Sequence, residues 1–127
     1  MPLLAPHIEK IYAIARIIFG LLFFCHGGQK LFGLFGGGPP EMNAALWIAG
    51  TIEFFGGAMV AAGLFTGWAA FLCSGLMAFA YFLAHQPQGF LPIQNRGEMA
   101  VLYCWFFLFA AAKGSGIWSI DAARGKG

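Results

Sequence analysis

The chain has 127 residues, of which 60% are hydrophobic and only 9% are charged. A water-soluble domain of this size needs more polar side chains to cover its surface, so the composition predicts an integral membrane protein. The formal net charge of +2 is small and scattered, which excludes the basic patches typical of nucleic-acid-binding proteins.

The first apolar segment predicts a membrane-spanning helix over residues 8–28. Arg16 interrupts it, and no small-residue cleavage site with a polar domain follows, so we expect an uncleaved span rather than a signal peptide. An arginine within a span costs about 2.5–3.5 kcal/mol on insertion scales and needs a polar partner. Steps of three and four residues place five positions along one side of this helix: Arg16, Gly20, Phe23, His26 and Lys30.

The next apolar stretch, residues 44–84, is too long for one crossing, which takes about 20 residues. Thr66-Gly67 is its natural break. The sequence therefore predicts two spans here, over residues 44–65 and 67–84, joined by a tight turn.

The last apolar segment predicts a shorter span over residues 97–113, whose Lys113 reaches toward the polar boundary. The whole chain is thus predicted to be one all-α domain over residues 1–127. We expect an integral membrane four-helix bundle, closed around the polar side of its first helix.

The basic residues predict an orientation, since cytoplasmic loops carry an excess of lysine and arginine. With both termini in the cytoplasm, four basic residues lie inside: Lys10, Lys113, Arg124 and Lys126. Only Lys30 and Arg96 then lie outside. For a bacterial chain this predicts a multi-pass protein of the inner membrane.

Glu53 is the one charged residue in the long apolar stretch, which makes it the expected partner of Arg16. Positions along the two predicted spans leave a gap of roughly 10 Å between these residues at a rise of 1.5 Å per residue. A third polar group or a water is expected to bridge it. The pair is either a structural ion pair or part of a functional site.

His26 and His85 lie at the outer ends of their predicted spans, where three interpretations stay open. They could handle protons beside a quinone head group, because histidine titrates near neutral pH. They could form a bis-histidine haem or metal site, although no HExxH or CxxCH motif supports one. They could also be interface histidines bonded to loop carbonyls.

The three cysteines fall singly in separate apolar segments, at Cys25, Cys73 and Cys104. Without paired spacing they predict neither a disulfide framework nor a thiolate metal site. We expect them to pack as small apolar side chains, and no metal site is predicted.

Four groups of residues run in order over nearly the whole chain: Arg16…Gly20…His26-Gly27…Lys30-Leu31, Ile52-Glu53…Gly56-Gly57…Gly63-Leu64-Phe65-Thr66, Asn95…Gly97-Glu98…Leu102-Tyr103 and Gly114-x-Gly116…Ser119-x-Asp121. With these residues the chain resembles the DoxX family. The resemblance implies a four-helix membrane bundle. The family's founding members are linked to a quinone-reducing thiosulfate oxidoreductase or a terminal quinol oxidase, and other members to redox stress or aromatic-compound responses. The resemblance therefore implies a redox-associated membrane subunit.

We expect the protein to interact with quinone as a subunit of an oxidoreductase system. No flavin, iron–sulfur or c-type haem motif is visible, so a protein partner or a homo-oligomer is implied. The candidate catalytic residues are His26 and Glu98, which could deliver protons. The candidate ligand-binding residues are Arg16, Lys30, Glu53, His85 and Asn95. The alternative is a non-enzymatic membrane scaffold or small-solute carrier with a structural polar core.

Overall fold

The computed structural model describes residues 1–36 and 41–125, and these residues form helices and loops with no strand. The predicted all-α class is confirmed. The longer helical segments are α1 (Ile8–Phe32), α2 (Ala44–Thr51) continuing through η2 (Ile52–Gly56) into α3 (Gly57–Ala62), α4 (Thr66–Ala80) continuing through η3 (Tyr81–His85) and η4 (Gln86–Gln88), and α6 (Glu98–Lys113). The short helices are η1 (Ala5–His7), α5 (Pro92–Asn95) and α7 (Ile120–Ala123).

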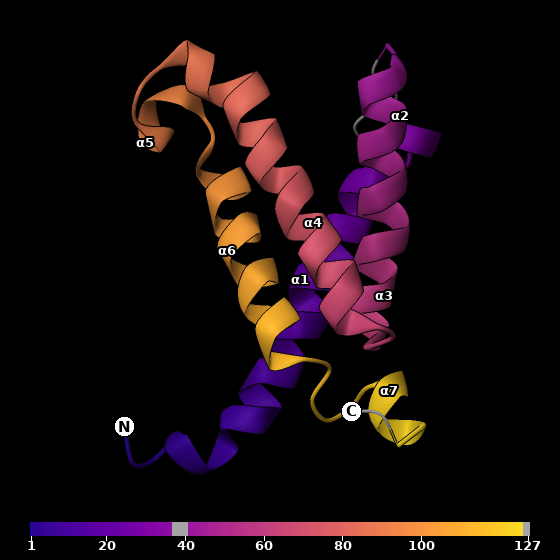
Figure 1. The fold of residues 1–127 in the computed structure, drawn as a ribbon, viewed down its shortest axis with the longest axis vertical. Coiled ribbons are helices and arrows are strands. Elements are labelled where there is room, and N and C mark those ends of the chain that lie inside the picture. Colours follow the sequence, from indigo (N-terminus) through magenta and orange to yellow (C-terminus); the bar gives the residue numbers. More distant parts are fainter. Residues whose placement is uncertain (37–40, 126–127) are drawn as a thin grey trace.

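These segments pack as two pairs that meet in the middle of the molecule and diverge toward one end (Figure 1). In one pair, α1 lies along η2 and α3; in the other, α4 lies along α6. The buried core at the meeting point holds Phe23 of α1, Val60 of α3, Cys73 of α4 and Phe107 of α6. The expected closed bundle is therefore open at the end where the pairs separate.

Glycines bring α1 and the second helical segment into backbone contact. A Cβ on Gly20 would lie 2.5 Å from the backbone nitrogen of Ala61, and one on Gly57 would lie 2.5 Å from that of Phe24. Any side chain at these positions would push the helices apart. Such close approach is how helices associate where lipid provides no hydrophobic drive between them.

The helix boundaries differ from the expected ones for local reasons. The first helix continues past residue 28 and ends at Gly33, whose φ of 67° suits a left-handed C-cap. The second ends at Gly63 with φ of 71°, so the tight turn precedes Thr66, which begins α4. The third helix extends through Gln88 because π- and 3₁₀-helical turns continue it beyond residue 84.

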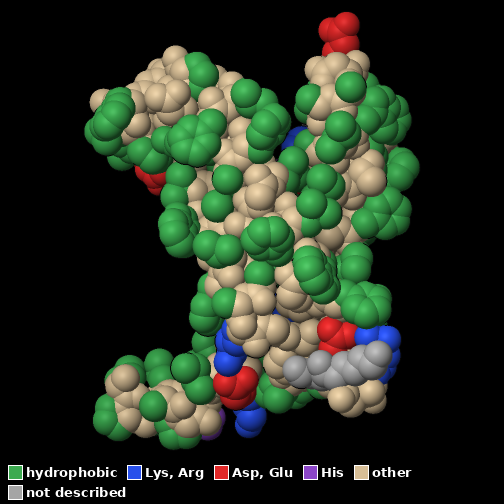
Figure 2. Space-filling view, in the orientation of Figure 1, with side chains coloured by type: hydrophobic (Ala, Val, Ile, Leu, Met, Phe, Trp, Pro, Cys, Tyr) green, Lys and Arg blue, Asp and Glu red, His purple; other side chains and the backbone are tan. Residues whose placement is uncertain are grey.

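Two of the described helical segments, Ala44–Ala62 and Thr66–Gln88, are long and apolar enough to cross a membrane. Hydrophobic side chains also cover much of the face shown in Figure 2. The N-terminal end and the tail that follows α6 both lie at the end of the molecule opposite α5, on different sides of it (Figure 1).

Candidate functional site

A cavity of about 600 Å³ lies where the two helix pairs diverge, and all four long helical segments contribute to its wall. Figure 2 shows the same region as a notch between two lobes. Most of the lining is apolar and includes Leu46, Leu76, Met77, Phe79 and Leu83. Five side chains that can donate or accept hydrogen bonds interrupt this wall: His26, Lys30, Glu53, His85 and Tyr103.

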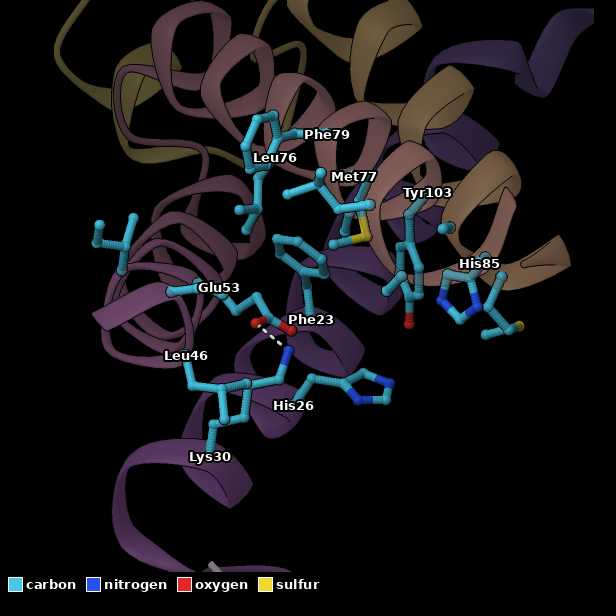
Figure 3. Close-up of a pocket in the computed structure, with 18 residues that line it drawn as sticks. Phe23, His26, Lys30, Leu46, Glu53, Leu76, Met77, Phe79, His85 and Tyr103 are labelled. Atoms are coloured by element: carbon cyan, nitrogen blue, oxygen red, sulfur yellow. Dashed lines mark hydrogen bonds and ion pairs between the residues drawn. The ribbon is translucent and has the colours of Figure 1, made fainter. Parts of the chain in front are cut away.

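Lys30 and Glu53 form an ion pair in the cavity wall, with the Lys30 ammonium donating to Oε2 of Glu53 (Figure 3). Lys30 comes from the last turn of α1, and Glu53 comes from the π-helical turn η2. The Glu53 side chain is 3% exposed and that of Lys30 is 28% exposed. A buried carboxylate needs such a partner to stay ionised.

His26 and Tyr103 lie next to each other on the same cavity, with ring centroids 6.1 Å apart and an edge-to-face arrangement. His26 is exposed, and its ring lies among the described residues without a hydrogen bond to them. Tyr103 is buried, yet its hydroxyl likewise has no partner there and is not sealed from the cavity. Both rings therefore have polar atoms available to a ligand (Figure 3).

His85 comes from the second π-helical turn, η3, and also lines the cavity, beside Tyr103 in Figure 3. Its Nδ1 lies 3.2 Å from the carbonyl oxygen of Asn95. Because a carbonyl oxygen only accepts, this bond requires the proton on Nδ1, which leaves Nε2 of the neutral ring as an acceptor. Turns of the π type often occur at functional sites, and here both of them carry a cavity residue.

The candidate ligand-binding residue Asn95 and the candidate catalytic residue Glu98 do not line the cavity. The buried Asn95 side chain donates to the Tyr81 hydroxyl (3.1 Å) and the Gly89 carbonyl (3.0 Å), and accepts from the Gly97 amide (2.8 Å). Its polar atoms are thus used in shaping the loop before α6. Glu98 is exposed at the first position of α6. The two candidate histidines, His26 and His85, do line the cavity.

The expected pairing of Arg16 with Glu53 is wrong. Arg16 is fully buried on the α1 segment that packs against α3 and the C-terminal tail, and it donates only to backbone carbonyls. Its acceptors are the carbonyls of Val60, Ala61, Ser115, Ile117 and Trp118. The Val60 and Ala61 carbonyls belong to the last turn of α3, whose negative end favours a cation, and the Val60 carbonyl also accepts from the Gly63 amide. Glu53 instead pairs with Lys30, so Arg16 lies outside the cavity lining.

The sequence pattern missed Tyr103 as a cavity residue. Its hydroxyl in the middle of the apolar stretch 98–113 is the signal that could have drawn attention to it. The cysteines are free and separate. Within residues 1–36 and 41–125, no three histidine, cysteine or acidic side chains are grouped so that they could hold a metal ion.

Comparisons with known proteins show a family match and a relative. The DoxX family model matches residues 11–86. An uncharacterized protein of Haemophilus influenzae is 37% identical over 116 residues, which cover 86% of this chain and 87% of the relative. No solved structure matches the chain. Since the family model covers more than half of the chain and the relative most of it, this membrane protein belongs to the DoxX family.

Proposed function

We propose that the cavity binds a flat, lipid-soluble ligand with a carbonyl-bearing head group, such as a quinone. The observation that carries this proposal is the composition of the wall: apolar side chains line most of it, and a few polar groups converge on one region. Ligand pockets of this size typically combine apolar walls with a few such groups, which fix the orientation of the ligand.

The polar groups have the chemistry that a quinone head group needs. A carbonyl oxygen accepts hydrogen bonds, and the Tyr103 hydroxyl and the Lys30 ammonium are donors at the cavity. His26 can donate as well through a ring N–H. The aliphatic and aromatic wall around Met77 and Phe79 suits the ring and the start of an isoprenoid tail.

A redox-associated role extends this proposal. Reduction of a bound quinone consumes two electrons and two protons, and His26 is the cavity residue best suited to pass protons. The electrons would come from a reduced redox protein that binds this chain. In a homo-oligomer, that protein could instead be bound to a second copy of the chain. Glu98 has no part in this scheme, because it lies outside the cavity.

The membrane arrangement that fits this function is a multi-pass protein of the inner membrane with both termini in the cytoplasm. The N-terminal segment and α7 lie at the same end of the molecule (Figure 1), and this placement together with the excess of basic residues in the terminal segments supports this orientation. The cavity would then lie toward the outer side of the bilayer. A quinone head group could reach it from the lipid.

Binding of a short-chain quinone to the protein in nanodiscs, corrected for uptake by empty nanodiscs, tests the proposal. We expect saturable binding that Tyr103→Phe and His26→Leu weaken by about 3- to 10-fold each, because one neutral hydrogen bond contributes about 0.5–1.5 kcal/mol. The matched controls are Tyr12→Phe and His7→Leu, which make the same changes outside the cavity. Unaltered affinity in both cavity variants, with thermal stability preserved, would leave these residues a structural role only.

A further inference from the structure

The ion pair in the cavity wall has polar atoms that its own members do not use. An ammonium group has three donors, and Lys30 makes one hydrogen bond with the described residues, to Oε2 of Glu53. The second carboxylate oxygen of Glu53, Oε1, has no hydrogen bond there. It is not sealed from solvent either, since no fully buried polar side-chain atom in the described part of the chain lacks a partner. A donor and an acceptor thus face the cavity side by side.

The two charges also compensate each other within the cavity. A negative ligand near Lys30 would be attracted by the ammonium and repelled by the carboxylate, so little net Coulomb energy would offset the cost of removing its charge from water. A positive ligand meets the same balance with the signs exchanged. The other polar residues of the lining are His26, His85 and Tyr103, none of which contributes a second carboxylate or ammonium group.

We propose that the Lys30–Glu53 pair makes the cavity selective for uncharged ligands, with Glu53 as the residue that excludes anions. Lys30 donates to a carbonyl or hydroxyl oxygen of the ligand, and the carboxylate cancels the charge that would otherwise draw fatty-acid and other anions from the membrane. Discrimination of this kind rests on a repulsive element as much as on an attractive one. The inference deepens the proposed function and rests on it, because it specifies the charge class of the same ligand.

Two naphthoquinones of similar shape provide the probes: menadione is neutral, and its hydroxylated analogue lawsone is an anion at neutral pH. Their affinities are measured in nanodiscs of zwitterionic lipid, each corrected for empty nanodiscs. The wild type should prefer menadione. Glu53→Gln leaves Lys30 without its counter-ion and should shift the affinity ratio toward lawsone by about 10-fold or more, the effect of roughly 1.4 kcal/mol.

Three further variants make the result decisive. Glu41→Gln makes the same chemical change at an exposed position outside the cavity lining, and should leave the ratio unchanged. Lys30→Gln leaves the carboxylate alone and should shift the ratio further toward menadione, which tests the inference even if Glu53→Gln does not fold. Lys30→Gln combined with Glu53→Gln removes both charges and should bring the ratio back toward the wild-type value.

The outcomes separate the two proposals. If the wild type binds menadione and both single variants keep the wild-type ratio, the pair does not select ligand charge, while the quinone site stands. If neither probe binds the wild type above the empty-nanodisc level, the proposed function fails and the charge selectivity fails with it.

Discussion

Arg16 shows how a single buried cation can hold distant parts of the chain together. Its guanidinium donates to two carbonyls near the end of α3 and to three in the tail after α6, at distances from 2.5 to 3.5 Å. The planar fork of five donors fits such a set of acceptors, and a lysine has only three donors on a point charge. The charge of Arg16 is compensated by helix-end and loop carbonyls rather than by a carboxylate.

Arg16→Lys should therefore destabilise the protein although it preserves the charge. The loss should be at least about 2 kcal/mol, because hydrogen bonds of charged groups contribute about 1.5–3 kcal/mol each and lysine cannot replace all of them. Unfolding in mixed detergent measures it. Arg124→Lys is the matched control, since Arg124 is exposed and pairs with Asp121. Equal stability of Arg16→Lys and the wild type would contradict the proposed anchoring.

At the scale of the elements, the contact between α1 and α3 depends on two backbones that touch. Gly20 and Gly57 lie opposite each other, and a Cβ on either would come within 2.7 Å of the other's carbonyl oxygen. Backbone cannot move aside as the end of a flexible side chain can. The helix pair must therefore separate to admit even a methyl group.

Gly57→Ala should destabilise the protein by about 1–3 kcal/mol, the usual cost of overpacking. Gly75→Ala on α4 is the control, because a Cβ there would meet nothing within 4 Å. It should be neutral or stabilising by up to about 1 kcal/mol, since alanine favours a helix over glycine. Thermal unfolding in one detergent compares them, and equal melting temperatures would show that the helices tolerate a wider separation.

The tail after α6 is a second element held by a specific network. Asp121 Oδ2 lies 2.7 Å from the Ser115 hydroxyl, and Asp121 Oδ1 lies 2.9 Å from the Arg124 guanidinium. The Ser115 hydroxyl is the main reason that the pKa of Asp121 is lowered, followed by Arg124, with burial acting in the opposite direction. Backbone amides of Thr66 and Phe65 lower the Asp121 pKa further.

A carboxyl whose pKa is lower in the folded state stabilises that state above its unfolded-state pKa, about 3.9 for aspartate. This contribution to the stability of the folded state is lost as the pH falls through the pKa of the carboxyl in the folded state. Amide hydrogen exchange of residues 115–123, corrected for the pH dependence of exchange in an unfolded chain, should therefore stay slow from neutral pH to about pH 4. Below that pH it should accelerate. Asp121→Asn should exchange faster at neutral pH and lose this acid transition, whereas Glu9→Gln should keep it. A profile identical in Asp121→Asn and the wild type would assign the transition to another group.

The whole molecule has its N-terminal segment and α7 at one end (Figure 1), and the cavity lies toward the other end, where the helix pairs diverge. The described basic residues near the termini are Lys10, Lys113 and Arg124, and Lys126 lies outside the described residues. Lys30 and Arg96 lie at the ends of helical segments toward the cavity side. This distribution supports the orientation with cytoplasmic termini.

Cysteine labelling of intact cells tests that orientation. In a background with the three native cysteines replaced by alanine, an impermeant reagent added from outside should label Gln88→Cys and spare Arg124→Cys. Permeabilised cells provide the control that both positions can react. Labelling of Arg124→Cys in intact cells would reverse the orientation and place the cavity toward the cytoplasm.

Much of the architecture followed from local patterns along the chain. The long apolar segments and the scarcity of charge predict a helical membrane protein, because only such segments can be buried in lipid with their backbone groups paired. Helical spacing also placed Phe23, His26 and Lys30 on one side of α1, and all three line the cavity. The DoxX resemblance, which rests on residue types and order, agrees with the family match over residues 11–86.

Which polar groups meet was decided by the tertiary structure alone. Charge and depth along the predicted spans favoured Arg16 as the partner of Glu53, but η2 and the separation of the helix pairs bring Glu53 to Lys30 instead. The acceptors of Arg16 are backbone carbonyls, and every residue has one, so residue type could not reveal them. The sequence by itself thus determined the fold class and the helix face that reaches the cavity. The pairing of its charges depended on how far apart the packed helices lie, a distance that no local pattern encodes.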